Sequence, residues 1–179
     1  MPTLVLTVIG DDRAGLVKAL ADVIAEGGGN WERSHLSELG GKFAGIVLVT
    51  VPEDRVDALR AALTPLEGLL DVSVHDAGAT PAPHEADGRA EVRHVRIELL
   101  GNDRPGIVGA VSGVLARHGL SVSSLESVTR DAPMAGGRLF DARAVVTVPR
   151  DADLSAVQAD LEEIASEIMV EVSLTPDEA

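Results

Sequence analysis

Two short stretches of this 179-residue chain combine glycine, acidic and basic residues at the spacing of an anion-binding loop. They are GDDRAG at residues 10–15 and GNDRPG at residues 101–106. Each lies between a segment of alternating apolar residues and a segment with helical periodicity. Two glycines separated by four residues are also how a phosphate-binding loop begins, so a nucleotide-binding protein is the first interpretation to test.

The residues after the second glycine exclude that interpretation. A phosphate-binding loop continues with Lys and Ser or Thr, whereas Leu16-Val17 and Ile107-Val108 follow here. Leu16 and Ile107 also begin the apolar stripe of the next segment. The sequence contains no Gly-x-Gly-x-x-Gly dinucleotide motif. Ser112 in GAVSG is one position late for a nucleophile elbow and falls within a predicted helix.

Carboxylate binding is a chemistry that the two stretches do fit. The free amides and dipole of a helix N-terminus favour an anion, and a glycine lets it approach the backbone. We expect Gly101 to turn the chain off the strand, Pro105 to occupy the first helical turn, and the Asp103 carboxylate to cap the helix at the Gly106 amide. The predicted ligand-binding residues are Asp12, Arg13, Ala14, Gly15, Leu16 and Asn30, with Asp103, Arg104, Pro105, Gly106, Ile107 and Ser121.

Asn30 and Ser121 enter this set as acceptors for the ammonium of an amino acid. Each begins the next predicted strand, which we expect to start close to the glycine turn. Alternatives remain at several of these positions. The turns would cap their helices with or without a ligand, and Arg13 and Arg104 could pair with surface acids instead of a bound carboxylate. Trp31 could form the wall of a ligand site or pack against the core.

The elements that position these residues occur twice. Residues 3–31 align without gaps to residues 94–122, with Leu4, Leu6 and Val8 in register with Val95, Ile97 and Leu99. This alternation predicts a strand with one apolar face. The apolar residues that follow recur at helical spacing, and glycines stop both helices; the stripes are Leu16, Ala19, Leu20, Val23 and Ile24, then Ile107, Ala110, Val111, Val114 and Leu115.

The similarity resumes after the helices, so each copy reads β-α-β-β-α-β. Strands are predicted at residues 30–39 and 42–52, a helix at 53–66 and a last strand at 69–75. The second copy has strands at 121–129 and 138–149, a helix at 150–167 and a strand at 168–174, with six extra residues within 129–137. This order predicts an α+β fold of two ferredoxin-like units, each an antiparallel sheet with both helices on one face.

The domain organisation follows from this duplication. We expect the first domain at residues 1–77 and the second at 92–175. Residues 78–91 lie between them and are rich in Pro, Ala, Gly and acidic residues, which is typical of a linker.

Two βαββαβ units with GxDRxG followed by Ile or Leu and Val at the first strand–helix junction resemble tandem ACT domains. The closest pattern is the group similar to the glycine cleavage system transcriptional repressor. The resemblance covers nearly the whole chain except the linker and the last residues. It implies a regulatory protein that binds a small effector, usually an amino acid, at interfaces between paired units.

The composition limits the other functional classes. A net charge of −14 opposes direct nucleic-acid binding and adhesion to an anionic membrane, and aromatic residues make up only 2% of the chain. The absence of cysteine excludes disulfides, thiol nucleophiles and cysteine-based metal sites. The five histidines lack metal-ligand spacing. We therefore expect no metal, no cofactor and no membrane segment, and a cytoplasmic location.

The sequence thus predicts a non-enzymatic regulator, a homodimer, that senses an amino acid such as glycine or serine. Its protein partner would be of the kind that an acidic chain attracts, such as a basic transcription factor controlling amino-acid metabolism. Two alternatives stay open: a ligand-independent interaction and dimerisation module, and an enzyme whose catalytic groups are distant in sequence. Pairing of the units within one chain or across a dimer is also left open.

Overall fold

A computed structural model describes residues 1–66, 68–77, 92–132 and 137–177 of the chain. The chain divides into two compact units, Met1–Ala86 and Asp87–Ala179. The predicted linker at residues 78–91 lies outside the described residues, and the predicted domain boundaries remain a prediction.

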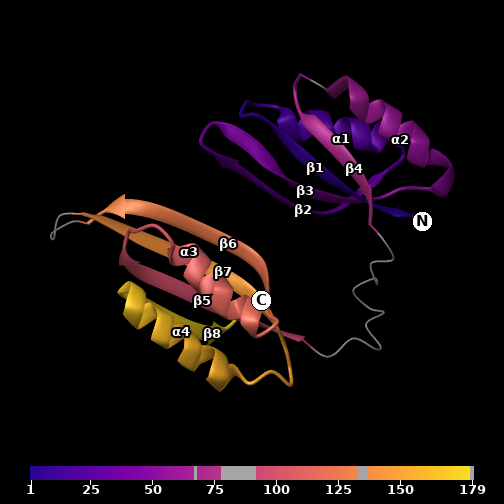
Figure 1. The fold of residues 1–179 in the computed structure, drawn as a ribbon. Helices are drawn as coiled ribbons and strands as arrows, with labels where there is room; N and C mark the ends of the chain where they lie inside the picture. The colour runs from indigo at the N-terminus through magenta and orange to yellow at the C-terminus, as the bar shows by residue number, and fades with distance from the viewer. Residues whose placement is uncertain (67, 78–91, 133–136, 178–179) are drawn as a thin grey trace. The chain divides into compact units, whose positions relative to one another are not determined.

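Each unit has the element order that the duplicated pattern predicts (Figure 1). The first unit contains β1 (Thr3–Asp11), α1 (Leu16–Glu26), β2 (Asn30–Leu39), β3 (Lys42–Thr50), α2 (Val56–Leu63) and β4 (Asp71–Asp76), with short 3-10 turns at Glu53–Arg55 and Thr64–Leu66. The second contains β5 (Val92–Asn102), α3 (Ile107–Arg117), β6 (Ser121–Asp131), β7 (Arg138–Pro149), α4 (Leu154–Ile168) and β8 (Val170–Pro176).

Within the described residues the strands form two antiparallel four-stranded sheets, in the orders β2-β3-β1-β4 and β6-β7-β5-β8. Both helices of a unit lie on one side of its sheet (Figure 1). The predicted α+β class with two ferredoxin-like units is therefore confirmed. The first and last strands of each unit lie next to each other, so the two ends of a unit meet in one sheet.

The cores lie between each sheet and its helices, where the alternating and helical stripes predict them. In the first unit Leu4, Leu6 and Val8 of β1 pack with Leu16, Leu20 and Ile24 of α1. In the second, Ile97 and Leu99 pack with the corresponding stripe of α3. Each helix then stops as predicted: Gly28 and Gly119 have positive φ, and their amides bond to Ala25 and Ala116 carbonyls in the manner of a Schellman motif.

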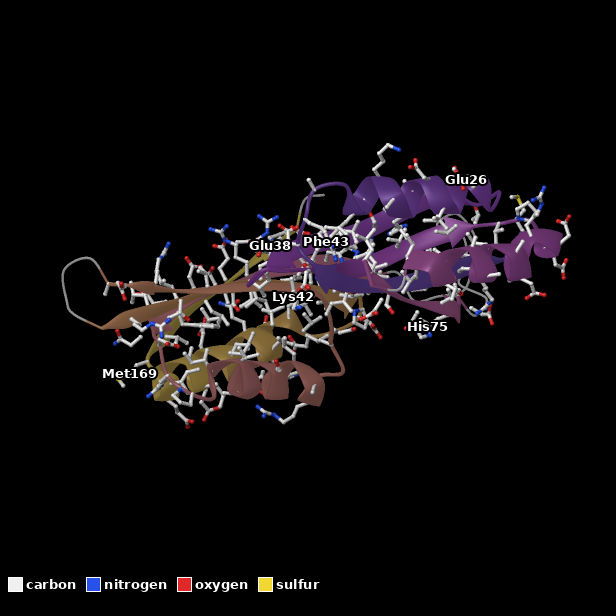
Figure 2. All side chains as sticks on the ribbon, turned by 90° about the horizontal axis from the view of Figure 1, so that it is seen from above. Glu26, Glu38, Lys42, Phe43, His75 and Met169 are labelled. Atoms are coloured by element: carbon white, nitrogen blue, oxygen red, sulfur yellow. The ribbon has the colours of Figure 1, made fainter. Side chains whose placement is uncertain are left out.

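The second helices differ from the predicted ranges at their ends. Helix α4 begins at Leu154 rather than near residue 150, because the Asp153 side chain accepts hydrogen bonds from the Ser155 and Ala156 amides at 2.9 and 3.2 Å and so caps it. Its end is the left-handed Met169, whose side chain is 66% exposed (Figure 2). The extra residues of the second copy follow β6, and 133–136 lie outside the described residues.

Candidate functional site

The two strand–helix junctions begin as extensions of their sheets. The Asp12 amide donates to the Gly41 carbonyl at 2.9 Å, and the Asp103 amide donates to the Arg138 carbonyl at 2.8 Å. The Asp12 backbone is therefore held by the β2–β3 turn, and the Asp103 backbone by β7, before the chain turns towards the helix.

The turn into each helix is made by the second glycine. Gly15 has φ 96° and ψ −4°, and Gly106 has φ 97° and ψ −7°. This left-handed conformation disfavours any residue with a Cβ atom. The space around both glycines is open, because an added Cβ would meet no atom within 4 Å. Backbone conformation is thus the reason that glycine occupies these positions.

The predicted Asp103 cap is wrong. Gly106 is itself the residue at the N-cap position, and neither α1 nor α3 has a side-chain cap. Pro105 precedes this residue, so it lies outside the first helical turn where we expected it. The physical reason is that the left-handed glycine reorients the chain between the aspartate and the helix. The amides of the first turn are consequently left without a side-chain acceptor at either junction.

Gly101 also has a different role from the expected one. It lies inside β5 rather than at a turn, and a Cβ atom there would come within 2.5 Å of Val170 Cγ1 and 2.7 Å of Val170 Cα. Gly10 has the same constraint in the first unit, where a Cβ would lie 2.5 Å from the Leu69 carbonyl oxygen. Both first glycines therefore allow the last strand of the unit to start close to the first.

The two arginines hold the junctions to the far end of the second helix of their units. Arg13 Nη2 donates to the Gly68 carbonyl at 3.2 Å, and Arg104 Nη2 donates to the Glu167 carbonyl at 3.0 Å. Neither arginine forms an ion pair within 4 Å in the part of the chain that the structure describes, although the charge of Arg13 contributes to lowering the pKa of Asp11. Each guanidinium keeps further N–H donors beside the helix N-terminus.

Asn30 and Ser121 do not lie near the junctions of their own units. Asn30 pairs with Thr50, which pairs with Thr3 at the start of β1, whereas the junction follows the other end of β1. Eight residue steps along a strand separate the two places by about 26 Å. Ser121 pairs with Thr147, which pairs with His94 in β5. Eight residue steps again separate His94 from Asn102, which precedes the junction. The expected proximity is wrong because the helix carries the chain back to the end of the sheet where the first strand starts, and the next strand begins there.

Asn30 takes part in a small polar cluster at the end of the sheet opposite the junction. Its Nδ2 donates to Glu32 Oε1 at 2.8 Å, and Thr50 Oγ1 donates to the same oxygen at 2.7 Å. The hydrogen bonds from Thr50 and Asn30 lower the pKa of Glu32. The Asn30 side-chain amide is therefore already hydrogen-bonded to a carboxylate of its own unit.

Sequence reasoning missed an ion pair beside the first junction. Lys42 Nζ pairs with Asp11 Oδ1 across β1 and β3, and this hydrogen bond lowers the pKa of Asp11. Lys42 lies at the β2–β3 turn, near Phe43 and Glu38 (Figure 2). The corresponding positions in the second unit are Asn102 and Leu139, so the pair is absent there. Only the strand register reveals it, because the two residues are 31 positions apart.

The remaining sequence candidates are structural. Trp31 is partly buried against the first core, which confirms the packing alternative. The described residues contain no group of three or more His, Asp or Glu side chains that could hold a metal ion. Leu16 and Ile107 are 2% exposed, so only their backbones can reach a ligand. None of the described helices is long and apolar enough to cross a membrane.

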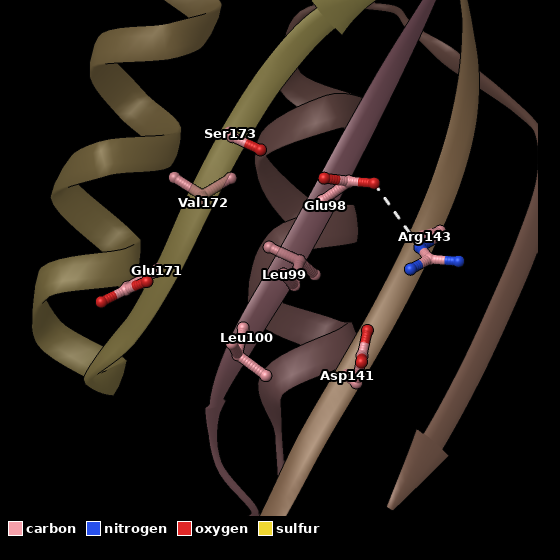
Figure 3. A pocket seen from close by; sticks show the side chains of 8 residues that line it. All are labelled: Glu98, Leu99, Leu100, Asp141, Arg143, Glu171, Val172 and Ser173. Atoms are coloured by element: carbon pink, nitrogen blue, oxygen red, sulfur yellow. Dashed lines mark ion pairs between the residues drawn. The ribbon is translucent and has the colours of Figure 1, made fainter.

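A separate hollow of about 350 Å³ lies on the sheet of the second unit, on the face away from its helices (Figure 3). The Glu98 and Arg143 side chains form an ion pair of 3.5 Å there. Asp141 and Glu171 lie farther along it, and Asp141 also pairs with Arg130 at 2.7 Å. No predicted ligand-binding residue lines this hollow, and its charged groups largely satisfy one another.

Sequence comparison agrees with the duplicated architecture. One sequence model of the ACT domain matches residues 2–75, and a second matches residues 95–166. The chain is a tandem ACT-domain protein. The two matched ranges end within the two structural units and contain both strand–helix junctions.

Several relatives match over most of the length of both chains. The chain is 23% identical over 172 residues to the glycine cleavage system transcriptional repressor of Escherichia coli strain K12, covering 96% of this chain and 88% of the relative. The same description and identity hold for a relative in Shigella flexneri. A crystal structure of a protein from Galdieria sulphuraria, described as unknown, matches with a TM-score of 0.86 and 29% identity over 98% of both chains. A structure described as a glycine cleavage system transcriptional repressor matches with a TM-score of 0.67, 19% identity and coverage of 97% and 96%.

Proposed function

We propose that this tandem ACT-domain protein is a non-enzymatic regulator that binds an amino acid such as glycine or serine. It would act through a protein partner to control the transcription of genes for amino-acid metabolism. The family and the similarity to the glycine cleavage repressor support a regulatory role that senses a small molecule. The observation that carries the proposal is the repeated junction, in which glycine conformation, uncapped helix and tethered arginine recur in both units.

The ligand carboxylate would bind at the amides of the first helical turn. The helix dipole and uncapped N–H groups favour an anion, and the open space beside Gly15 and Gly106 gives it access. The proposed contacts at one junction come from Asp12, Arg13, Ala14, Gly15 and Leu16. At the other they come from Asp103, Arg104, Pro105, Gly106 and Ile107.

In this proposal the acceptors for the ligand ammonium come from a second copy of the chain. Asn30 and Ser121 lie about 26 Å from the junction of their own unit, at the other end of the sheet. If an edge strand pairs in antiparallel fashion with its counterpart in a second copy, the start of one strand lies beside the end of the other. The Asn30 or Ser121 of one copy then lies at the end of its partner's sheet from which the junction leaves.

Exposed apolar side chains on the second unit support such a homodimer. Val122 and Leu125 of β6 and Val108 of α3 are 41%, 46% and 41% exposed, and β6 is an edge strand. Unpaired edges with apolar neighbours favour association with another strand. Light scattering of the purified chain measures the expected dimer, and Leu125→Lys should shift it to a monomer.

Calorimetric titration with individual amino acids tests the sensing function directly. We expect heat of binding for glycine or serine in the unmodified chain. Gly106→Val and Gly15→Val should each remove binding at their own junction with the circular dichroism spectrum intact, and the double variant should lose it at both. Ser121→Ala and Asn30→Ala should weaken it. Ser124→Ala, on the same strand as Ser121, is the matched control. Absence of heat and of any thermal shift with all the amino acids would reject sensing.

A ligand-independent interaction and dimerisation module is the second candidate, favoured by the same exposed edge of β6. It predicts that the dimer and the partner complex are indifferent to every amino acid, whereas sensing predicts that one amino acid changes them. The net charge of −14 supports a basic protein partner, such as a transcription factor, rather than nucleic acid or membrane. We propose a cytoplasmic location, where such a partner would be found.

A further inference from the structure

The second unit contains a second hollow, which differs from the one in Figure 3 and is also separate from the junctions. It lies at the start of β5, beneath the first turns of α4 and beside the end of β8, and its volume is about 190 Å³. The junction follows the opposite end of β5. Most of its wall is apolar, and the residues that line it are Arg93, His94, Val95, Leu154, Gln158, Leu174, Thr175 and Pro176.

Arg93 supplies the hollow with a buried donor that has no acceptor. Its Nη2 donates to the Ala152 carbonyl at 3.0 Å, which holds the guanidinium beside the start of α4. Its Nε is buried, and no group among the described residues accepts a hydrogen bond from it. Buried polar groups in proteins almost always have a partner, and a charged group without one is costly. This orphaned N–H therefore indicates an acceptor that the described residues do not provide.

The carboxylates that the structure describes around this hollow have other partners. Asp153 caps the first turn of α4, and Asp177 pairs with Arg96 at 2.5 Å. Glu162 accepts a hydrogen bond from the Gln158 side chain at 2.7 Å. Among the residues that the structure describes, Arg93 forms no ion pair. Within the described part of the chain, the hollow thus combines apolar walls with a guanidinium that has no carboxylate partner.

The first unit closes the same place with its own side chain. Arg60 of α2 corresponds to Gln158, since Leu59 and Leu63 occupy the core positions of Val157 and Leu161. Arg60 donates to the Val74 carbonyl at 3.3 Å and to Asp76 at 2.6 Å, so its guanidinium lies against the last strand. The residue in register with Arg93 is Pro2, which has no donor side chain. The first unit thus lacks an equivalent of the Arg93 donor.

We propose that this hollow binds a short branched aliphatic carboxylate, which would accept hydrogen bonds from the Arg93 guanidinium and rest its hydrocarbon against Val95, Leu154 and Leu174. A carboxylate is the planar acceptor that matches a guanidinium, and its charge neutralises that of Arg93. The apolar wall selects an aliphatic body over a strongly hydrated inorganic anion. The site is independent of the amino-acid site proposed at the junctions, because it needs no ammonium acceptor.

Nuclear magnetic resonance of the full chain with isovalerate tests the proposal. The Nε–H resonance of Arg93, assigned by its loss in Arg93→Met, should shift on titration together with methyl resonances of Leu154 and Leu174. Isovaleramide, which has the same shape without the charge, should bind at least about tenfold more weakly, since a charge-assisted hydrogen bond is lost. An unmoved Arg93 resonance at saturating millimolar isovalerate would overturn the proposal.

Three variants separate this site from a general effect on folding. Gln158→Arg copies the first unit and should abolish isovalerate binding by filling the hollow, with the unfolding transition retained. Arg93→Lys keeps the positive charge but lacks the planar guanidinium with its several N–H donors, and should weaken binding by about tenfold or more. Arg60→Gln makes the reverse exchange in the first unit and should leave the affinity unchanged. Equal isovalerate binding by the unmodified chain and Gln158→Arg would place the ligand elsewhere and reject the assignment.

The junction variant Gly106→Val distinguishes this inference from the proposed function. It should retain isovalerate binding while losing amino-acid binding at the second junction. If instead both ligands are lost together, isovalerate is binding at the junction, and the hollow beside Arg93 is not its site.

Discussion

The two units have the same core and different outer sheet faces. In both, alternating Val, Leu and Ile residues pack under two helices. The opposite face of the first sheet carries apolar residues, including Ile9 and Ile46, which are 50% and 51% exposed. The corresponding face of the second sheet carries the Glu98–Arg143 and Arg130–Asp141 pairs. The difference teaches that the buried pattern specifies the fold, while residues on the outer face are free to specialise each unit.

The largest expected effect tests whether each core stabilises only its own unit. Leu20→Ala should lower the unfolding free energy of the first unit by about 2–5 kcal/mol, because it leaves a cavity at a fully buried position. Trp31 is the only tryptophan and packs on that core, so its fluorescence reports this transition. Ile97→Ala should shift the circular dichroism transition of the second unit and leave the fluorescence midpoint unchanged. A common shift of both signals would refute independent cores.

The second effect tests whether the two junctions are equivalent. Gly15→Ala and Gly106→Ala should each cost about 1–2 kcal/mol in urea unfolding, because both glycines have nearly the same left-handed conformation in open space. Gly109→Ala, inside α3 and also in open space, should instead stabilise by about 0.5–1 kcal/mol. Unequal costs at Gly15 and Gly106 would show that the junctions differ in strain.

A smaller effect contrasts a capped helix with an uncapped one. Asp153→Ala should destabilise the second unit by about 1 kcal/mol, because two α4 amides lose their acceptor. Asp103→Ala should change thermal stability by less than about 0.5 kcal/mol, since its carboxylate caps no helix. A loss at Asp103 as large as that at Asp153 would restore the capping role predicted from the sequence.

The smallest effect is a pH dependence confined to the first unit. Lys42 lowers the pKa of Asp11 below its ordinary value of 3.8, so the folded state binds the proton less well than the unfolded state. The stabilisation from this pair is complete above pH 3.8 and is lost as the pH falls through the lower folded pKa. Asp11→Asn should therefore differ from the unmodified chain at pH 6 by Trp31 fluorescence, and the difference should vanish at low pH. A difference that persists in acid would exclude the ion pair as its cause.

The fold could be predicted because its determinants are periodic and occur twice. Leu4, Leu6 and Val8 define one strand face, and the same spacing at Val95, Ile97 and Leu99 removes doubt about the period. The candidate site was harder to predict from the sequence, because its geometry depends on the pairing register of the strands and on the backbone conformation of single residues. The left-handed Gly106 displaced Asp103 from the cap, and the return path of the helix placed Asn30 at the far end of the sheet. Neither fact is visible as a local pattern.

The strand order also bears on how the chain is made. Because β1 lies between β3 and β4, the first sheet is complete only when β4 ends at Asp76. The first strand of the second unit begins at Val92. During synthesis from the N-terminus, the first unit therefore has every strand of its sheet before β5 exists. Two units with such similar apolar patterns are prone to exchange strands, and this spacing in time lets each sheet close on its own strands.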